Sequence, residues 1–250
     1  GPPRTMSNVE ALLDLAALSK GGLGGQGTAP GRLSEPFAYV NAALMATIVA
    51  VLAASVAIYL WDPEYFTLVW AAEDRTVENG TALFLLVSSI VLALHSRSLG
   101  IKVQRGAMVL TAIYALMFFL AAGEEISWGQ RIFGWESGEF FQENNKQLET
   151  NFHNLMVGDF HLAKTLFGPV LTLCILLYLV ALPWAFRRWA GVAALANRFA
   201  VPVPWLRHAA VALAASLIIV VIDVGRKWEV YELIFALISV SIFILPRNRD

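Results

Sequence analysis

The sequence predicts an all-α integral membrane protein with about six transmembrane helices, and three observations lead to this fold class. Hydrophobic residues make up 58% of the 250-residue chain and charged residues only 15%, whereas soluble domains are nearer ~45–50% apolar and ~25% charged. Long apolar stretches recur along the chain, and a helix needs ~20 apolar residues to cross a bilayer. These stretches do not alternate as membrane-barrel strands do, which leaves helices as the expected spanning form.

Six apolar stretches are the expected membrane spans. The first and fourth are long enough to cross on their own, whereas the other four need flanking polar residues or protein neighbours at one end. In chain order they are Tyr39–Trp61, Gly80–Leu94, Ala107–Ala122, Thr165–Phe186, Ala209–Ile222 and Leu233–Leu245.

The chain around these spans divides into four expected parts. Residues 1–36 are expected to be a tag remnant, Gly1–Thr5 ahead of Met6, followed by a cytoplasmic segment. Residues 37–246 are expected to form one transmembrane domain. Within it, residues 123–164 form an extracytoplasmic polar segment, expected to be an interfacial or re-entrant helical segment between the third and fourth spans. Residues 247–250 are a short cytoplasmic tail.

Basic residues set the expected orientation. Twelve of the 18 Lys and Arg residues fall in the two terminal segments and in residues 95–106 and 186–208, and 15 of the 19 acidic residues fall on the opposite side. Cytoplasmic loops carry an excess of Lys and Arg. Both chain termini are therefore expected in the cytoplasm.

Composition and motif content exclude several function classes. The near balance of 18 basic and 19 acidic residues leaves no net positive field for a nucleic acid. A single cysteine, Cys174, rules out a disulfide framework and a cysteine-based zinc site. The chain also lacks a Walker A motif, a G-x-S-x-G nucleophile motif and a histidine box.

The first candidate site lies where the third span ends, at Glu124 and Glu125. If that helix continues, Glu124, Trp128 and Arg131 share one face, and Glu124 is expected to pair with Arg131 because an unpaired acid beside the membrane is costly. Glu125 would point elsewhere and be free for another partner. The alternative is that both carboxylates are solvated charges at a helix end.

The second candidate site is a polar stripe of Asn145, Glu149 and His153 at positions i, i+4 and i+8 of an expected helix. Glu125, Glu149 and His153 are the predicted ligands of a divalent metal ion, because a Glu and a His one turn apart can share one ion. The same pair could instead form a carboxylate-oriented imidazole that activates water. The alternative is a hydrated surface helix with an ordinary Glu149–His153 contact.

Further candidates lie on the same side of the membrane. Asp74 and Glu78 form an acidic i,i+4 pair, which needs a cation, a metal or a raised pKa because like charges at this spacing repel. Asp223 is expected to pair with a basic residue one turn later. The others are Glu232, near the start of the sixth span, and His161, the second extracytoplasmic histidine.

Three runs, AGEEISWGQRIFGWES, ENNKQLETNFHNL and EDRTVENGTA, resemble a group of uncharacterised bacterial multi-pass membrane proteins. The resemblance implies a bacterial cytoplasmic (inner) membrane location and no particular activity. A more distant similarity is to the CAAX-type intramembrane proteases, in which a glutamate and a histidine activate water. It implies that role for Glu124, Glu125 and His153, although Arg131 stands further from the acidic pair than in that family and the final histidine motif is missing.

These features favour a membrane-embedded hydrolase or transferase that acts on a lipid or lipid-linked substrate at the extracytoplasmic face. The catalytic candidates are Glu124, Glu125 and His153, activating water directly or through a metal. The residues expected to contact the substrate are Trp128, Arg131, Asn145 and Asn154, the last three at an anionic head group.

A non-catalytic scaffold or accessory subunit is the alternative function. In that case residues 123–164 bind a partner membrane protein through aromatic anchors and a polar rim. A transporter is a third reading, but it requires polar groups that continue to the cytoplasmic side, and the spans carry few.

Overall fold

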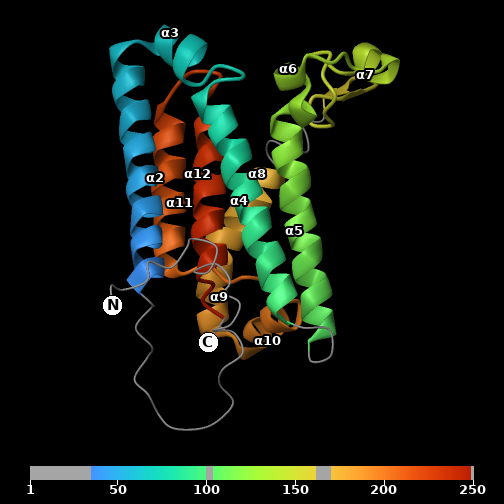
Figure 1. Cartoon of the computed structure of the whole chain (residues 1–250). Helices are drawn as coiled ribbons and strands as arrows, with labels where there is room; N and C mark the ends of the chain where they lie inside the picture. The colour runs from blue at the N-terminus through green and yellow to red at the C-terminus, as the bar shows by residue number, and fades with distance from the viewer. Residues whose placement is uncertain (1–34, 100–103, 162–169, 249–250) are drawn as a thin grey trace, which may run out of the picture.

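The computed structural model describes residues 35–99, 104–161 and 170–248, and these residues are mostly helical. Within them, six helical rods run side by side, and α2 begins at the same end of the rods at which α12 ends (Figure 1). The expected N-terminal tag remnant and segment fall outside the described residues, apart from the first residues of α2.

Each predicted apolar stretch corresponds to a helical rod, although part of the fourth stretch, residues 165–169, lies outside the described residues. The fourth rod is built from α8 (Leu171–Leu176), the π-helical turn η5 (Leu177–Ala181) and α9 (Leu182–Arg188). The other rods are α2 (Glu35–Trp61), α4 (Thr76–Leu99), α5 (Arg105–Glu125), α11 (Leu206–Val221) and α12 (Lys227–Ile244).

Four of these rods are long and apolar enough to cross a membrane: Phe37–Trp61, Thr76–Leu99, Arg105–Glu125 and Leu171–Arg188. The shorter α11 is also apolar. Large apolar side chains such as Leu60, Met117 and Leu217 point outward and are exposed. An apolar outer surface of this extent needs a lipid environment, so this is a membrane protein.

Helix α12 forms the centre of the bundle. It packs against α4, α2 and α11, and Figure 1 shows it between α2 and α4. Nearly every side chain from Val230 to Phe243 is buried, as expected for a helix that is apolar on all sides. The charged residues of α12 lie in its first two turns, which places them all at one end of the bundle.

A buried chain of hydrogen bonds links three rods. The ring nitrogen Nδ1 of His208 in α11 accepts from the backbone N–H of Trp205 at 3.1 Å, so Nε2 carries the proton and donates to Ser241 of α12 at 2.9 Å. Ser241 in turn donates to Oδ1 of Asn41 in α2. His208 is therefore a structural residue of the core.

Short elements close the two ends of the bundle. At one end, α3 (Pro63–Tyr65) and the π-helical turn η2 (Phe66–Trp70) follow α2, and Asp62 caps α3 by accepting from two backbone N–H groups. At the other end, α10 (Ala190–Arg198) lies across the rods (Figure 1).

The segment 126–161, called the cap here, sits at the end of α5 and beside the α3 end of the bundle (Figure 1). Its elements are the 3₁₀ turn η3 (Ser127–Gly129), α6 (Gln130–Phe133), α7 (Glu139–Asn144), and the two-residue antiparallel strands β1 (Met156–Val157) and β2 (Phe160–His161). The expected segment 123–164 between the third and fourth spans is described as far as residue 161, and within that part helices occur only in its first half.

Candidate functional site

The chain reverses sharply where α5 ends. Ser127, Trp128 and Gly129 have φ values of 45°, 56° and 79°, three consecutive left-handed residues that rarely occur without glycine. This turn carries Arg131 off the face of α5, so the predicted Glu124–Arg131 ion pair is wrong. The predicted proximity of Glu124 and Trp128 is confirmed, because the indole Nε1 donates to Glu124 at 3.0 Å.

Arg131 instead joins the cap to the segment ahead of α4. Its guanidinium forms ion pairs with Asp74 and Glu149, and a longer one with Glu73 at 3.9 Å. The acidic pair Asp74–Glu78 was predicted to need a cation, and Arg131 supplies it by pairing with Asp74. The carboxylate of Glu78 accepts a hydrogen bond from the backbone N–H of Asp74.

Glu149 is the buried centre of the cap. Its carboxylate accepts from Ser127 Oγ at 2.6 Å and from Asn151 Nδ2 at 2.8 Å. Asn145, also buried, donates through Nδ2 to Asn151 at 2.9 Å. Because its carboxylate accepts two side-chain hydrogen bonds and also pairs with Arg131, Glu149 is held in one position and connects separate parts of the cap.

The predicted helix through Asn145, Glu149 and His153 is wrong, because α7 ends at Asn144 and residues 145–155 form a compact loop. The Oδ1 atom of Asn145 accepts from the backbone N–H groups of Gln147 at 2.9 Å and of Glu149 at 3.3 Å. Asparagine side chains that bond nearby backbone compete with helix formation. The three residues therefore do not form a stripe on one helical face.

His153 lies beside Glu124 in spite of this change. Glu124 Oε2 accepts from the backbone N–H of Phe152 at 2.5 Å, and the Nδ1 atom of His153 is 3.9 Å from the same oxygen. The amide of Asn154 lies 3.0 Å from Nε2 of His153, and an amide nitrogen can only donate. Nε2 is then the acceptor and Nδ1 carries the proton on the side of the carboxylate. The 3.9 Å separation is too long for a hydrogen bond but lets Glu124 pair with the ring once it is protonated.

A second group of carboxylates gathers at the same end of the bundle. Glu125 at the end of α5 lies within electrostatic range of Glu78 from α4 and of Glu229 and Glu232 from α12. The charged neighbours of Glu125, which was predicted to be free for another partner, are thus other acids. Arg226 lies at the edge of this group, 3.6 Å from Glu229.

The predicted metal ligands Glu125, Glu149 and His153 do not form a metal site. Among residues 35–99, 104–161 and 170–248, no three His, Cys, Asp or Glu side chains lie close enough together to hold an ion. The carboxylate of Glu149 is engaged by Arg131, Ser127 and Asn151. We therefore assign no step to a metal.

The predicted substrate contacts are only partly available. Asn145 is buried within the cap, and Arg131 is engaged by three acids. Asn154 and Trp128 lie next to the Glu124–His153 pair. The donor groups of both are engaged as well, the amide by Gln147 and the indole by Glu124, so a substrate must displace them, and the described part of the cap has no unengaged arginine.

Two predicted residues remain, Asp223 and His161. Asp223 does not pair with the basic residues that follow it: Arg226 binds Glu73 at 2.5 Å, and Lys227 donates to the backbone oxygen of Ile222 at 2.7 Å. His161 ends the short strand β2.

Sequence reasoning missed Glu73 and the role of Ser127. Glu73 accepts from both Arg226 and the side-chain amide of Gln147, at 2.5 and 2.7 Å, and so links α12 to the cap. The sequence signal that could have identified Glu73 was its position directly before Asp74, which was already a candidate. Nothing in the local sequence around Ser127 indicated a buried hydrogen bond to Glu149.

No protein-family model, curated protein or solved structure matches this chain.

Proposed function

We propose that this protein is a membrane-embedded hydrolase or transferase that acts on a lipid or lipid-linked substrate at the extracytoplasmic face, with water activated by Glu124 and His153. The observation that carries the proposal is the Glu124–His153 pair, which lies beside four further carboxylates where an apolar helical bundle ends. Ionisable groups are costly beside lipid and usually serve a function there.

The chemistry follows from the orientation of the histidine. Glu124 faces Nδ1–H and would stabilise the imidazolium, while Nε2 would take a proton from water once a substrate displaces the Asn154 amide. The activated water would then attack the carbonyl carbon of a carboxylic ester, and the imidazolium would return its proton to the leaving oxygen as the ester C–O bond breaks. Because the surrounding residues Glu78, Glu125, Glu229 and Glu232 are acids, the site favours a neutral or cationic reacting group over an anionic one.

Six crossings with both termini in the cytoplasm, in a bacterial inner membrane, complete the proposal. The distribution of arginines supports this orientation, because seven arginines lie at the end of the bundle opposite the cap. These arginines are Arg97, Arg105, Arg187, Arg188, Arg198, Arg207 and Arg247.

The proposal is tested by turnover of a panel of phospholipids and lipid-linked esters by detergent-purified protein, with products followed by mass spectrometry. We expect His153→Ala to lower turnover by about 10²–10⁴-fold, the usual contribution of a general base. The control His95→Ala replaces a histidine in the last turns of α4, at the end of the bundle away from the cap, and should keep wild-type turnover. Full activity in His153→Ala would exclude His153 as the base.

Neutralising Glu125 should stabilise the protein while lowering turnover. At alkaline pH, where these acids are ionised, Glu125 is repelled by Glu78, Glu124, Glu229 and Glu232. Glu125→Gln removes this repulsion, which is on the order of 1 kcal/mol, so the unfolding midpoint is compared at alkaline pH. The control Glu143→Gln changes an exposed acid of α7 and should leave both properties unchanged. A thermal unfolding midpoint for Glu125→Gln at or below the wild-type value would contradict the repulsive arrangement.

A non-catalytic binding function is the second candidate, and the surface of the cap favours it. Apolar side chains there are exposed, including Phe133 at 79% and Phe160 at 68%, and patches of this kind mark interaction surfaces. In this case a partner membrane protein co-purifies with the wild type and is lost in Phe133→Ser, Trp128→Ala or Trp135→Ala but kept in His153→Ala.

A further inference from the structure

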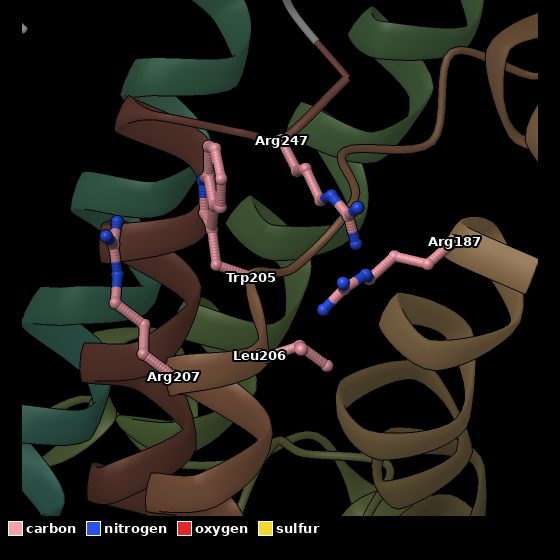
Figure 2. Close-up of a pocket in the computed structure, with 5 residues that line it drawn as sticks. All are labelled: Arg187, Trp205, Leu206, Arg207 and Arg247. Carbon is pink, nitrogen blue, oxygen red and sulfur yellow. The ribbon is translucent and has the colours of Figure 1, made fainter.

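The opposite end of the bundle holds a pocket with a basic lining. Its volume is about 360 Å³, and its walls come from α9, from the start of α11 and from the chain after α12. Figure 2 shows the guanidinium groups of Arg187 and Arg247 directed toward one another across the pocket. The lining residues are Arg187, Trp205, Leu206, Arg207 and Arg247.

The positive charge of this pocket is not neutralised by the described part of the protein. None of the ion pairs formed between described residues involves Arg187, Arg207 or Arg247. Arg247 donates to the backbone oxygen of Pro183 at 3.0 Å, which leaves most of its five N–H donors available. Burial, together with the charge of Arg187, lowers the pKa of Arg247, as expected for like charges held together.

The walls are fixed in place by backbone contacts. The indole Nε1 of Trp205 donates to the backbone oxygen of Leu245 at 2.9 Å, and the backbone N–H of Arg247 donates to Val203 at 2.8 Å. The side chain of Arg207 lies over the ring of Trp205, 5.5 Å from its centroid. The arginines are therefore presented by an organised surface that needs little rearrangement to bind a ligand.

We propose that this pocket binds a phosphate group, held between Arg187 and Arg247, and that Trp205 and Leu206 contact the apolar part of its carrier. Arginine forms paired hydrogen bonds with phosphate oxygens. Basic pockets between helices bind anionic lipid head groups, and tryptophan prefers the level of the head groups. An anionic phospholipid is one source of the phosphate, and free inorganic phosphate is the other. This site is separate from the Glu124–His153 pair and does not depend on its function.

The test is thermal unfolding and native mass spectrometry of the full chain, with added phosphatidylglycerol, phosphatidylcholine or inorganic phosphate. We expect phosphatidylglycerol to bind more tightly than phosphatidylcholine and to raise the unfolding midpoint. Arg187→Gln/Arg247→Gln should weaken its binding by roughly tenfold or more, because charge-assisted hydrogen bonds are lost. The control Arg198→Gln, at the same end of the bundle, should bind as the wild type does.

The outcomes separate the two sources. Preference for phosphatidylglycerol that disappears in the double variant supports a lipid phosphate. Equal stabilisation by inorganic phosphate, again lost in the double variant, supports the phosphate site and assigns it to a free anion. Equal binding of all three additives, or wild-type binding by a double variant that unfolds at the wild-type temperature, would overturn the proposal. If the double variant unfolds early, the single variant Arg247→Gln is measured in the same way.

Discussion

Arg131→Met is expected to lower the free energy of unfolding by about 3 kcal/mol. Removing the guanidinium leaves the carboxylate of Glu149, whose side chain is only 8% exposed, without its cationic partner. Removal of one partner of a buried ion pair typically costs ~3–5 kcal/mol, and we place this variant at the low end because the Arg131 side chain is 35% exposed. Denaturant titration of the detergent-purified protein measures the change in the free energy of unfolding.

The control for this variant is Arg75→Met. Arg75 is exposed, and it is absent from the ion pairs of the described chain, so its replacement should change stability by less than about 0.5 kcal/mol. Arg131→Met/Glu149→Gln should recover part of the loss, because the buried charge is then removed as well. A double variant no more stable than Arg131→Met would show that the loss does not come from the isolated carboxylate.

His208→Ala is expected to destabilise the protein by about 3 kcal/mol. The substitution leaves a cavity in the core and removes one of the two partners of Ser241 and the acceptor of the backbone N–H of Trp205. Each effect typically contributes ~1–3 kcal/mol. Thermal unfolding of the purified variant measures the loss.

Two companion variants identify its origin. Ser239→Ala removes a hydroxyl that bonds only within α12, to the backbone oxygen of Phe235, and should have little effect. His208→Asn keeps a polar atom near the position of Nδ1 and should recover part of the stability. Equal losses in His208→Ala and His208→Asn would indicate that packing alone, rather than the hydrogen bond to Trp205, is responsible.

The positions of the rods along the chain could be predicted because hydrophobicity along a chain is a local property. Tyr39–Trp61 and Ala107–Ala122 were predicted as spans, and the structure extends them by a few residues to α2 and α5. The central position of α12 was not predicted. Its apolar composition resembles that of the other spans, and only packing separates a helix that contacts protein on all sides from one that contacts lipid.

The candidate site was predicted less well because it depends on contacts between distant residues and on an irregular backbone. Arg131 pairs with Asp74, 57 residues earlier in the chain, which no spacing rule indicates. The left-handed turn at Ser127 and Trp128 replaces the helix that the sequence pattern predicts. Glu124 and His153 are nevertheless neighbours, as predicted, because the loop 145–155 places His153 beside the end of α5.

The central position of α12 has a consequence for biosynthesis. The ribosome completes α2, α4 and α11 before it reaches α12, yet each of these three helices packs against α12 in the finished protein. Until α12 enters the membrane, the faces that will contact it have only lipid or one another to contact. Helices α4 and α5 can already pack against each other at that stage, but the packing of α2, α4 and α11 around the centre of the bundle is completed only once α12 is inserted.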